Sequence, residues 1–257
     1  MTNRSHRSDR TDLPDRIAPT YRPHEPVVMR QEWRHLSFLH WPVAPEVVRA
    51  LLPDDLTVDT FEGRAYVGLV PFTMRNVRPA GAPAVRGLSY FHETNVRTYV
   101  HHRGGHPGVW FFSLDAANEI AVRIARTVWK LPYHYARMSL GGDGESIVYA
   151  SERCRPGPLP GDCRATITPT GNAFFAVPGT LEHFLAERYL LYSRANGRLY
   201  RGRVHHAPYP LRSARLETLT ESLTGAAGFA FDGPPPLVHY AAGVEVDVFP
   251  LRPILLR

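Results

Sequence analysis

From Val27 onward, short segments of alternating or mixed apolar and polar residues dominate the chain and predict strands. They cover residues 33–40, 56–61, 65–74, 90–101, 109–114, 135–140, 146–152, 164–168, 189–193, 199–205, 211–217 and 238–248. Short helices are expected at 45–53, between two prolines, at 117–129, at 180–187 behind the capping residue Thr180, and near Glu221. Many antiparallel strands with few helices predict an α+β, mostly β fold: a closed, antiparallel-rich β-barrel with peripheral helices.

Neither an internal repeat nor a linker interrupts this pattern, so residues 27–257 are expected to form a single domain. Residues 1–26 are rich in Arg, Asp, Ser, Thr and Pro and indicate a disordered basic tail. Asn196 and Gly197 predict a hairpin turn between the strands at 189–193 and 199–205. The segment 109–114 is apolar on both faces and is expected to be covered on both sides.

The strand at 90–101 carries the densest chemistry of the chain. Alternation gives it a β-branched face of Thr94, Val96, Thr98 and Val100 and a polar face that carries an acid, an amide, a guanidinium and a phenol. The residues of the polar face are Glu93, Asn95, Arg97 and Tyr99. On an open sheet this face would be solvated, whereas inside a barrel it would line the lumen, where charges must be hydrogen-bonded or face a ligand. The sequence alone leaves both interpretations open.

Lys130 is the only lysine among the thirty basic residues of the chain. Amine chemistry through an imine is therefore restricted to this residue or to the N-terminus. The other interpretation is an ordinary cation at the end of the helix 117–129, in a chain whose codon usage replaces lysine by arginine.

The net charge of +6 and the pI of about 9.5 raise the question of nucleic-acid binding. Five arginines lie in the first 22 residues and the others are interleaved with acids, and no recognition motif is found, so no specific nucleic-acid partner is expected. No apolar run approaches the ~18–20 residues of a membrane span, and no secretory signal is found, so a cytoplasmic protein without a membrane partner is expected. In that compartment Cys154 and Cys163 are expected as free thiols, and no Cys/His spacing indicates a metal.

Several stretches resemble the YqjF-like family of uncharacterised proteins (domain of unknown function 2071). They are residues 39–43, 51–53, 70–72, 91–100, 109–115, 131–133, 136–138, 185–192 and 204–211. The motifs are specific together and weak singly, and they cover about residues 28–249. The family is similar in turn to acetoacetate decarboxylase, through Asp115, residues 120–122 and Pro132. The resemblance implies a cone-shaped barrel around a small-molecule cavity, with Glu93 matching an acidic pocket residue.

The chain departs from the decarboxylases at the catalytic lysine pair, because Tyr133 and His134 stand in those positions. The arrangement that lowers the pKa of the nucleophilic lysine is therefore absent. The decarboxylase arginine near the start of the barrel falls at Trp41. Schiff-base catalysis is accordingly not carried over, although Lys130 lies only two residues before Pro132.

The candidate catalytic residues are Glu93, as a general base if burial raises its pKa, and Lys130. The candidate substrate-binding residues are Asn95, Arg97, Tyr99, Tyr133 and His134, of which only one of the last two is expected to face inward. His205, His206 and His239 are further candidates, the first two with a hydrogen-bonded strand end as the alternative.

The predicted function is a small-molecule pocket that acts on a carboxylated or carbonyl compound by acid–base chemistry, without cofactor or metal. A non-catalytic binding or sensing protein is the alternative, and a basic protein that binds nucleic acid or surfaces is a third class, whose binding would weaken steeply with salt. Uncovered barrel edges would favour a homodimer.

Overall fold

The computed structural model describes residues 14–255, and across them thirteen strands form one sheet. The strands are β1 (Met29–Val43), β2 (Thr57–Val58), β3 (Ala65–Pro79), β4 (Phe91–His102), β5 (Gly105–Ala116), β6 (Tyr133–Gly141), β7 (Ile147–Arg155), β8 (Asp162–Phe174), β9 (Leu190–Ala195), β10 (Arg198–His206), β11 (Leu211–Glu221), β12 (Leu237–Val248) and β13 (Arg252–Pro253). The helical segments are η1 (Ala18–Thr20), α1 (Pro45–Arg49), α2 (Glu119–Ile124) with its π-helical continuation η2 (Ala125–Trp129), α3 (Leu181–Ala186) and α4 (Leu223–Ala226).

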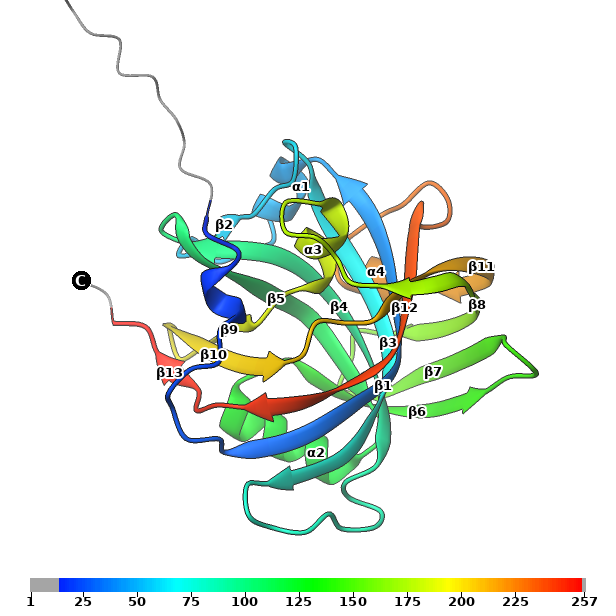
Figure 1. Cartoon of the computed structure of the whole chain (residues 1–257), viewed down its shortest axis with the longest axis horizontal. Coiled ribbons are helices and arrows are strands. Elements are labelled where there is room, and N and C mark those ends of the chain that lie inside the picture. The colour runs from blue at the N-terminus through cyan, green and yellow to red at the C-terminus, as the bar shows by residue number, and fades with distance from the viewer. Residues whose placement is uncertain (1–13, 256–257) are drawn as a thin grey trace, which may run out of the picture.

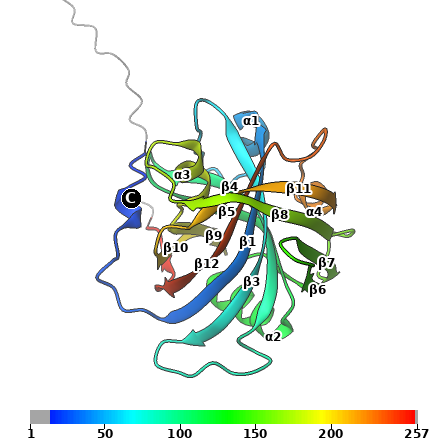
Figure 2. The ribbon, with the colours of Figure 1, turned by 45° about the vertical axis from the view of Figure 1, so that its right-hand side comes forward.

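Two additional pairings, β4 with β5 and β10 with β12, close the sheet. The result is two rings of strands that share part of their strands. The first, called here the cavity ring, runs through β1, β3, β4, β5, β9, β10 and β12. The second replaces β9 and β10 by β6, β7, β8 and β11. The strands of the sheet do not lie evenly around one axis, so the mostly β prediction is confirmed while the regular closed barrel is not. Figure 1 shows α1 and α3 at one end of the molecule and α2 at the other, and Figure 2 agrees.

The strands shared by the two rings form a wall with a different apolar core on each face. On β3, for example, Val70 and Phe72 belong to the core of the cavity ring, whereas Val67 and Leu69 belong to the core of the second ring. In β1 the pairing with β3 shifts register between Arg34 and Leu39, around a left-handed residue, His35 (φ 53°). This bulge lets Trp33 and Leu36 face the same side although they are three residues apart, which strict alternation would forbid.

Closure of the cavity ring depends on a close approach between β5 and β9. A Cβ atom at Gly108 of β5 would lie 2.7 Å from the backbone oxygen of Leu190 in β9. Only glycine therefore fits at this point of the parallel pairing.

Most predicted elements are found in the structure. The hairpin over Asn196 is present, and segment 109–114 is covered on both faces, since Phe111 lines a cavity while Trp110 and Phe112 pack on the second core. The strand predicted at 56–61 is too long. Only Thr57–Val58 pair with β4, and the chain then turns towards β3.

Part of the segment expected as a disordered tail is packed against the body. Residues 1–13 lie outside the described part, but Arg16 bonds Asp59 (2.5 Å), Arg22 bonds Asp247 (2.6 Å) and Glu25 bonds Arg252 (2.8 Å). These contacts connect residues 16–25 with the segment after β2, with β12 and with β13.

Candidate functional site

The cavity ring encloses a cavity of about 330 Å³. Its lining is mainly apolar, with contributions from every strand of the ring and from α2 and η2. Apolar lining residues include Trp33, Leu36, Val70, Phe72, Met74, Phe91, Phe111, Leu114, Trp129, Leu131, Leu190, Val204 and Val248, and the main polar ones are Glu93, Asn95, Arg97, Tyr133, Arg188 and Tyr209. A small polar cluster thus stands in an apolar enclosure, which is the usual composition of a small-molecule site.

The polar face of β4 points into this cavity. Glu93, Asn95 and Arg97 line it, whereas Val96 and Val100 on the opposite face belong to the second core. These three side chains are at most 9% exposed, so the solvated-face interpretation is excluded. Tyr99 follows the same alternation but is not among the lining residues, because its hydroxyl donates to the backbone oxygen of Leu185 (2.7 Å).

Glu93 is buried beside a second negative group. Its carboxylate accepts a hydrogen bond from the hydroxyl of Tyr133 (2.8 Å). Burial raises the pKa of Glu93 to about 8; the Tyr133 bond acts against this rise, and the charge of Asp115 adds to it. Burial and the Glu93 charge also raise the pKa of Tyr133 well above its usual range. At neutral pH the protonated form of Glu93 therefore predominates. Near pH 8 the protonated and ionised forms are both present, so Glu93 can both donate and accept a proton there.

Asp115 itself is fully paired and serves the fold. Both of its oxygens accept from Arg153 at 2.7 Å, and the two side chains are 0% and 1% exposed. Such a bidentate pair compensates both charges in the interior. The contribution of Asp115 to the site is thus its charge near Glu93.

Two arginines form the cationic end of the cavity. Arg97 donates to the oxygen of Leu185 (3.0 Å), at the end of the cavity next to α3, while its Nε has no partner. Arg188 donates to Asp59 (2.7 Å) and to the oxygen of Phe184 (2.7 Å), while its Nη2 has no partner. Asn95, next to Arg97 on the same face, has an unpaired Oδ1. Buried polar atoms without partners are costly, so their gathering at one end of one cavity indicates a site for a polar ligand.

His40 and Arg97 are both hydrogen-bonded to the hydroxyl of Tyr99. The Nε2 atom of His40 lies 2.6 Å from the Tyr99 hydroxyl, which donates to Leu185, so Nε2 is the donor of this pair and Nδ1 remains an unpaired acceptor. A Cβ at Gly68 would lie 2.9 Å from the His40 ring and 3.5 Å from Arg97. The glycine therefore makes room for this stack of side chains.

The structure separates the sequence candidates. Tyr133 lines the cavity, whereas His134 turns away and bonds the oxygen of Pro156 (2.7 Å), so one of the two faces inward as expected. Lys130 is not among the lining residues, although Trp129 and Leu131 on either side are. Its amine donates to Thr127 O and its backbone is left-handed (φ 57°), which ends the helical segment.

The histidine candidates are also placed apart from the polar end. His205 and His239 do not line the cavity, and His206 is stacked on Tyr189 with ring centroids 4.5 Å apart. Burial lowers the pKa of His206 to about 4, so it is neutral. The sequence analysis did not identify Arg188 and His40 as candidates, although both lie in stretches that resemble the family (185–192 and 39–43). Their positions follow from hydrogen bonds to residues far away in the sequence, Asp59 for Arg188 and Tyr99 for His40.

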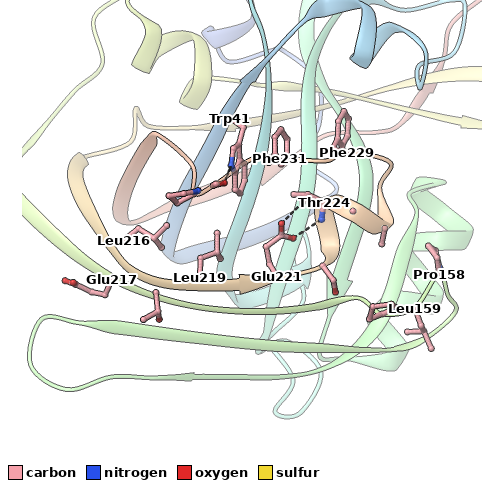
Figure 3. A pocket seen from close by; sticks show the side chains of 17 residues that line it. Trp41, Pro158, Leu159, Leu216, Glu217, Leu219, Glu221, Thr224, Phe229 and Phe231 are labelled. Carbon is pink, nitrogen blue, oxygen red and sulfur yellow. Dashed lines mark hydrogen bonds between the residues drawn. The ribbon is translucent and has the colours of Figure 1, made fainter.

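A second hollow lies on the other side of the shared wall. This aromatic groove, about 860 Å³ in volume, lies between β11, α4, the loop 158–160 and the aromatic side chains of Trp41, Phe229 and Phe231. Figure 3 shows Glu221 bonded to Thr224 within it. None of its described lining residues carries a buried polar atom without a partner, which distinguishes it from the cavity.

Within residues 14–255, no group of three or more His, Cys, Asp or Glu side chains is arranged to hold a metal ion. Over the same residues, no helix is long and apolar enough to cross a membrane. Cys154 and Cys163 are both free thiols, and burial raises the pKa of Cys163 to about 12.

Comparison with known proteins identifies a family and a relative that are both uncharacterised. The sequence profile of DUF2071, described as an uncharacterised conserved protein family, matches residues 30–245. The uncharacterised protein YqjF of Bacillus subtilis (strain 168) is 39% identical over 225 residues, which is 88% of this chain and 92% of that protein.

Similar solved structures include the acetoacetate decarboxylase of Legionella pneumophila, with a TM-score of 0.59, 12% identity, and coverage of 99% of this chain and 98% of that one. The enduracididine biosynthesis enzyme MppR, solved with pyruvate, has a TM-score of 0.60 and 14% identity, with 89% and 90% of the two chains covered. At these identities the likeness shows a common fold.

Proposed function

Since the chain belongs to the DUF2071 family of uncharacterised conserved proteins and has an acetoacetate decarboxylase-like fold, we propose that its cavity binds a small carboxylated carbonyl compound and moves a proton on it through Glu93. The observation that carries the proposal is the gathering of partly unpaired Asn95, Arg97 and Arg188 in the same cavity as a protonatable carboxyl group. A structural neighbour that was solved with pyruvate supports this substrate class.

The binding roles follow from the donors that face the cavity. Arg97 and Arg188 are cations that take the carboxylate of the ligand. The NH₂ group of Asn95 donates to the carbonyl oxygen, and its unpaired Oδ1, an acceptor, is left for a hydroxyl group of the ligand. The apolar lining keeps water away, which strengthens these interactions.

The proposed chemistry is proton transfer at the carbon next to the carbonyl group. The Glu93 carboxylate accepts the proton from this carbon, the C–H electron pair forms a carbon–carbon double bond, and the carbonyl oxygen becomes an enolate near the arginines. Return of the proton from Glu93 restores the substrate. No step passes through Lys130, whose amine bonds Thr127 in the structure; its imine role remains a separate prediction.

The test measures proton exchange on 2-oxobutanoate in D₂O by NMR, with affinity from calorimetry. We expect exchange that rises with pH up to about pH 8, where Glu93 loses its proton. Glu93→Gln should bind with similar affinity and exchange at the buffer rate. Arg97→Ala should lose roughly 10- to 100-fold in affinity, as expected for a hydrogen bond to a charged group.

Two results would contradict parts of this proposal. Affinity that is unchanged in Arg97→Ala would exclude the carboxylate site. Arg97-dependent binding with equal exchange in wild type and Glu93→Gln would favour the alternative, a non-catalytic binding or sensing protein. Arg194→Ala changes an exposed arginine of β9 outside the cavity and is the matched control for loss of positive charge.

A further inference from the structure

The cavity is polar at one end only. Along β4 the lining residues succeed one another as Arg97, Asn95, Glu93 and Phe91, spaced by about 7 Å per two residues. Arg97 bonds Leu185 of α3, which places it at the α3 end, and Asn95 is the next buried residue of the row. Beyond Glu93, towards the opposite end, the side chains of this row become apolar.

The apolar part is built by three neighbouring strands. Phe91 of β4 pairs with Met74 of β3, which pairs in turn with Trp33 of β1. All three line the cavity, and beyond them Val77 and Leu88 line it as well. From Glu93 onward the cavity therefore presents apolar side chains over the length of several residues.

The same end of the cavity leads towards solvent. Phe91 and Met74 are buried, whereas Val77, Arg78, Leu88, Met29 and Gln31 are partly exposed. Asn118, at the start of α2, donates to the oxygens of Gly87 and Leu88, so α2 borders this end. Ala121 and Ile124 of α2 line the cavity.

We infer that the ligand is amphipathic, with an oxygenated head held at Arg97 and Asn95 and an unbranched or aromatic apolar body lying along Phe91, Met74 and Trp33 towards α2. A compound of three or four carbons would fill only the polar end and leave apolar side chains without contact. Apolar surface that the ligand buries against these residues stabilises the complex in proportion to its area. The inference rests on the proposed function for the position of the head, and it adds the substrate class.

The test uses unbranched 2-oxo acids from three to twelve carbons, with affinities measured by calorimetry. We expect the affinity to rise about three- to fourfold per added methylene, and to stop rising when the chain passes Phe91 and Met74 and reaches the partly exposed end. Short acids that bind as tightly as long ones would overturn the inference.

A pair of variants on α2 tests the direction of the chain. Ala121→Phe places a larger side chain inside the apolar part, so it should weaken long acids by at least tenfold and leave the three-carbon acid unaffected. Ile120→Phe changes the neighbouring position, which is 59% exposed and does not line the cavity, and should have no effect. Equal loss for short and long acids in Ala121→Phe would contradict the proposed direction.

Failure of this inference is distinguishable from failure of the proposed function. If Arg97→Ala weakens acids of every length equally while chain length has no effect, the head site stands and the apolar site falls. If chain length matters but Arg97→Ala has no effect, the apolar cavity stands, the head site of the proposed function fails, and the amphipathic ligand is overturned with it.

Discussion

The two hollows of this protein lie on opposite sides of one wall of strands and differ in how their polar groups are satisfied. In the aromatic groove Glu221 bonds Thr224 and the Trp41 indole bonds Gly233. In the cavity Arg97, Arg188 and Asn95 each keep a buried polar atom without a partner. The groove is the larger of the two. The site that we propose is therefore the smaller hollow, and the proposal rests on its unsatisfied polar groups and not on its size.

The physical reason lies in the cost of burial. A buried polar group without a partner costs about 1–3 kcal/mol, and a fold tolerates several together where another molecule supplies the partners. The stacked rings of Trp41 and Phe231, with centroids 4.6 Å apart, instead indicate a surface that stabilises the fold.

The largest expected effect concerns Trp41. Trp41→Ala removes a side chain that is only 5% exposed and should lower the free energy of unfolding by about 3–5 kcal/mol. Affinity for 2-oxo acids should stay unchanged, because the groove lies across the wall from the cavity. Urea unfolding and calorimetry measure the two quantities, with Trp41→Phe as the milder control. A tenfold loss of affinity in the folded variant would break the distinction between the two hollows.

The next effect is the pH dependence of stability through Glu93. Its pKa is about 8 in the folded protein and 4.5 in the reference state, so the unfolded chain loses its proton first as pH rises. Its contribution to stability is therefore complete below pH 4.5 and falls by about 1 kcal/mol per pH unit until about pH 8. Glu93→Gln should remove this slope, as urea unfolding between pH 5 and 9 would show.

The groove offers the matched control for this measurement. Hydrogen bonds from Arg215 and Thr168 lower the pKa of Glu217, and this carboxylate lies at the surface. Glu217→Gln should keep the slope of the wild type. A Glu93→Gln protein with the slope of the wild type would show that Glu93 titrates normally and would remove the basis for its proton-transfer role.

The smallest expected effect concerns Glu221 and tests whether the aromatic groove contributes to stability alone. Glu221 accepts from the backbone amide of Thr224 (2.9 Å) at the start of α4. Glu221→Ala should therefore lower the free energy of unfolding by about 1 kcal/mol and leave ligand affinity as it is. A change in ligand affinity without a change in thermal unfolding would mean that the groove, too, is a binding surface.

Much of the site was readable from alternation along one strand. Alternation assigns Glu93, Asn95 and Arg97 to one face, and the structure places all three side chains in one cavity. Alternation also predicts that only one of Tyr133 and His134 faces inward, and the structure shows that it is Tyr133. The sorting into faces depends only on local backbone geometry, which the sequence specifies well.

Other features required the folded chain. Arg188 reaches the cavity because Asp59, 129 residues away, fixes its guanidinium, and no local pattern encodes that pairing. Lys130, although next to lining residues, bonds its own helical segment because the left-handed residue reverses the chain there.

The sequence by itself determined where most elements lie and, away from bulges such as the one at His35, which side chains share a strand face. It did not fix their bounds: the strand predicted at 164–168, for example, is part of β8 (Asp162–Phe174). Only the tertiary structure decided which face encloses a cavity, which arginines end up in it, and that the strands close into two uneven rings. The reason is that alternation is a property of adjacent residues, whereas closure depends on pairings such as β5 with β9 and β10 with β12, between segments far apart in the chain. Twist, bulges and close approaches at residues such as Gly108 set those pairings together.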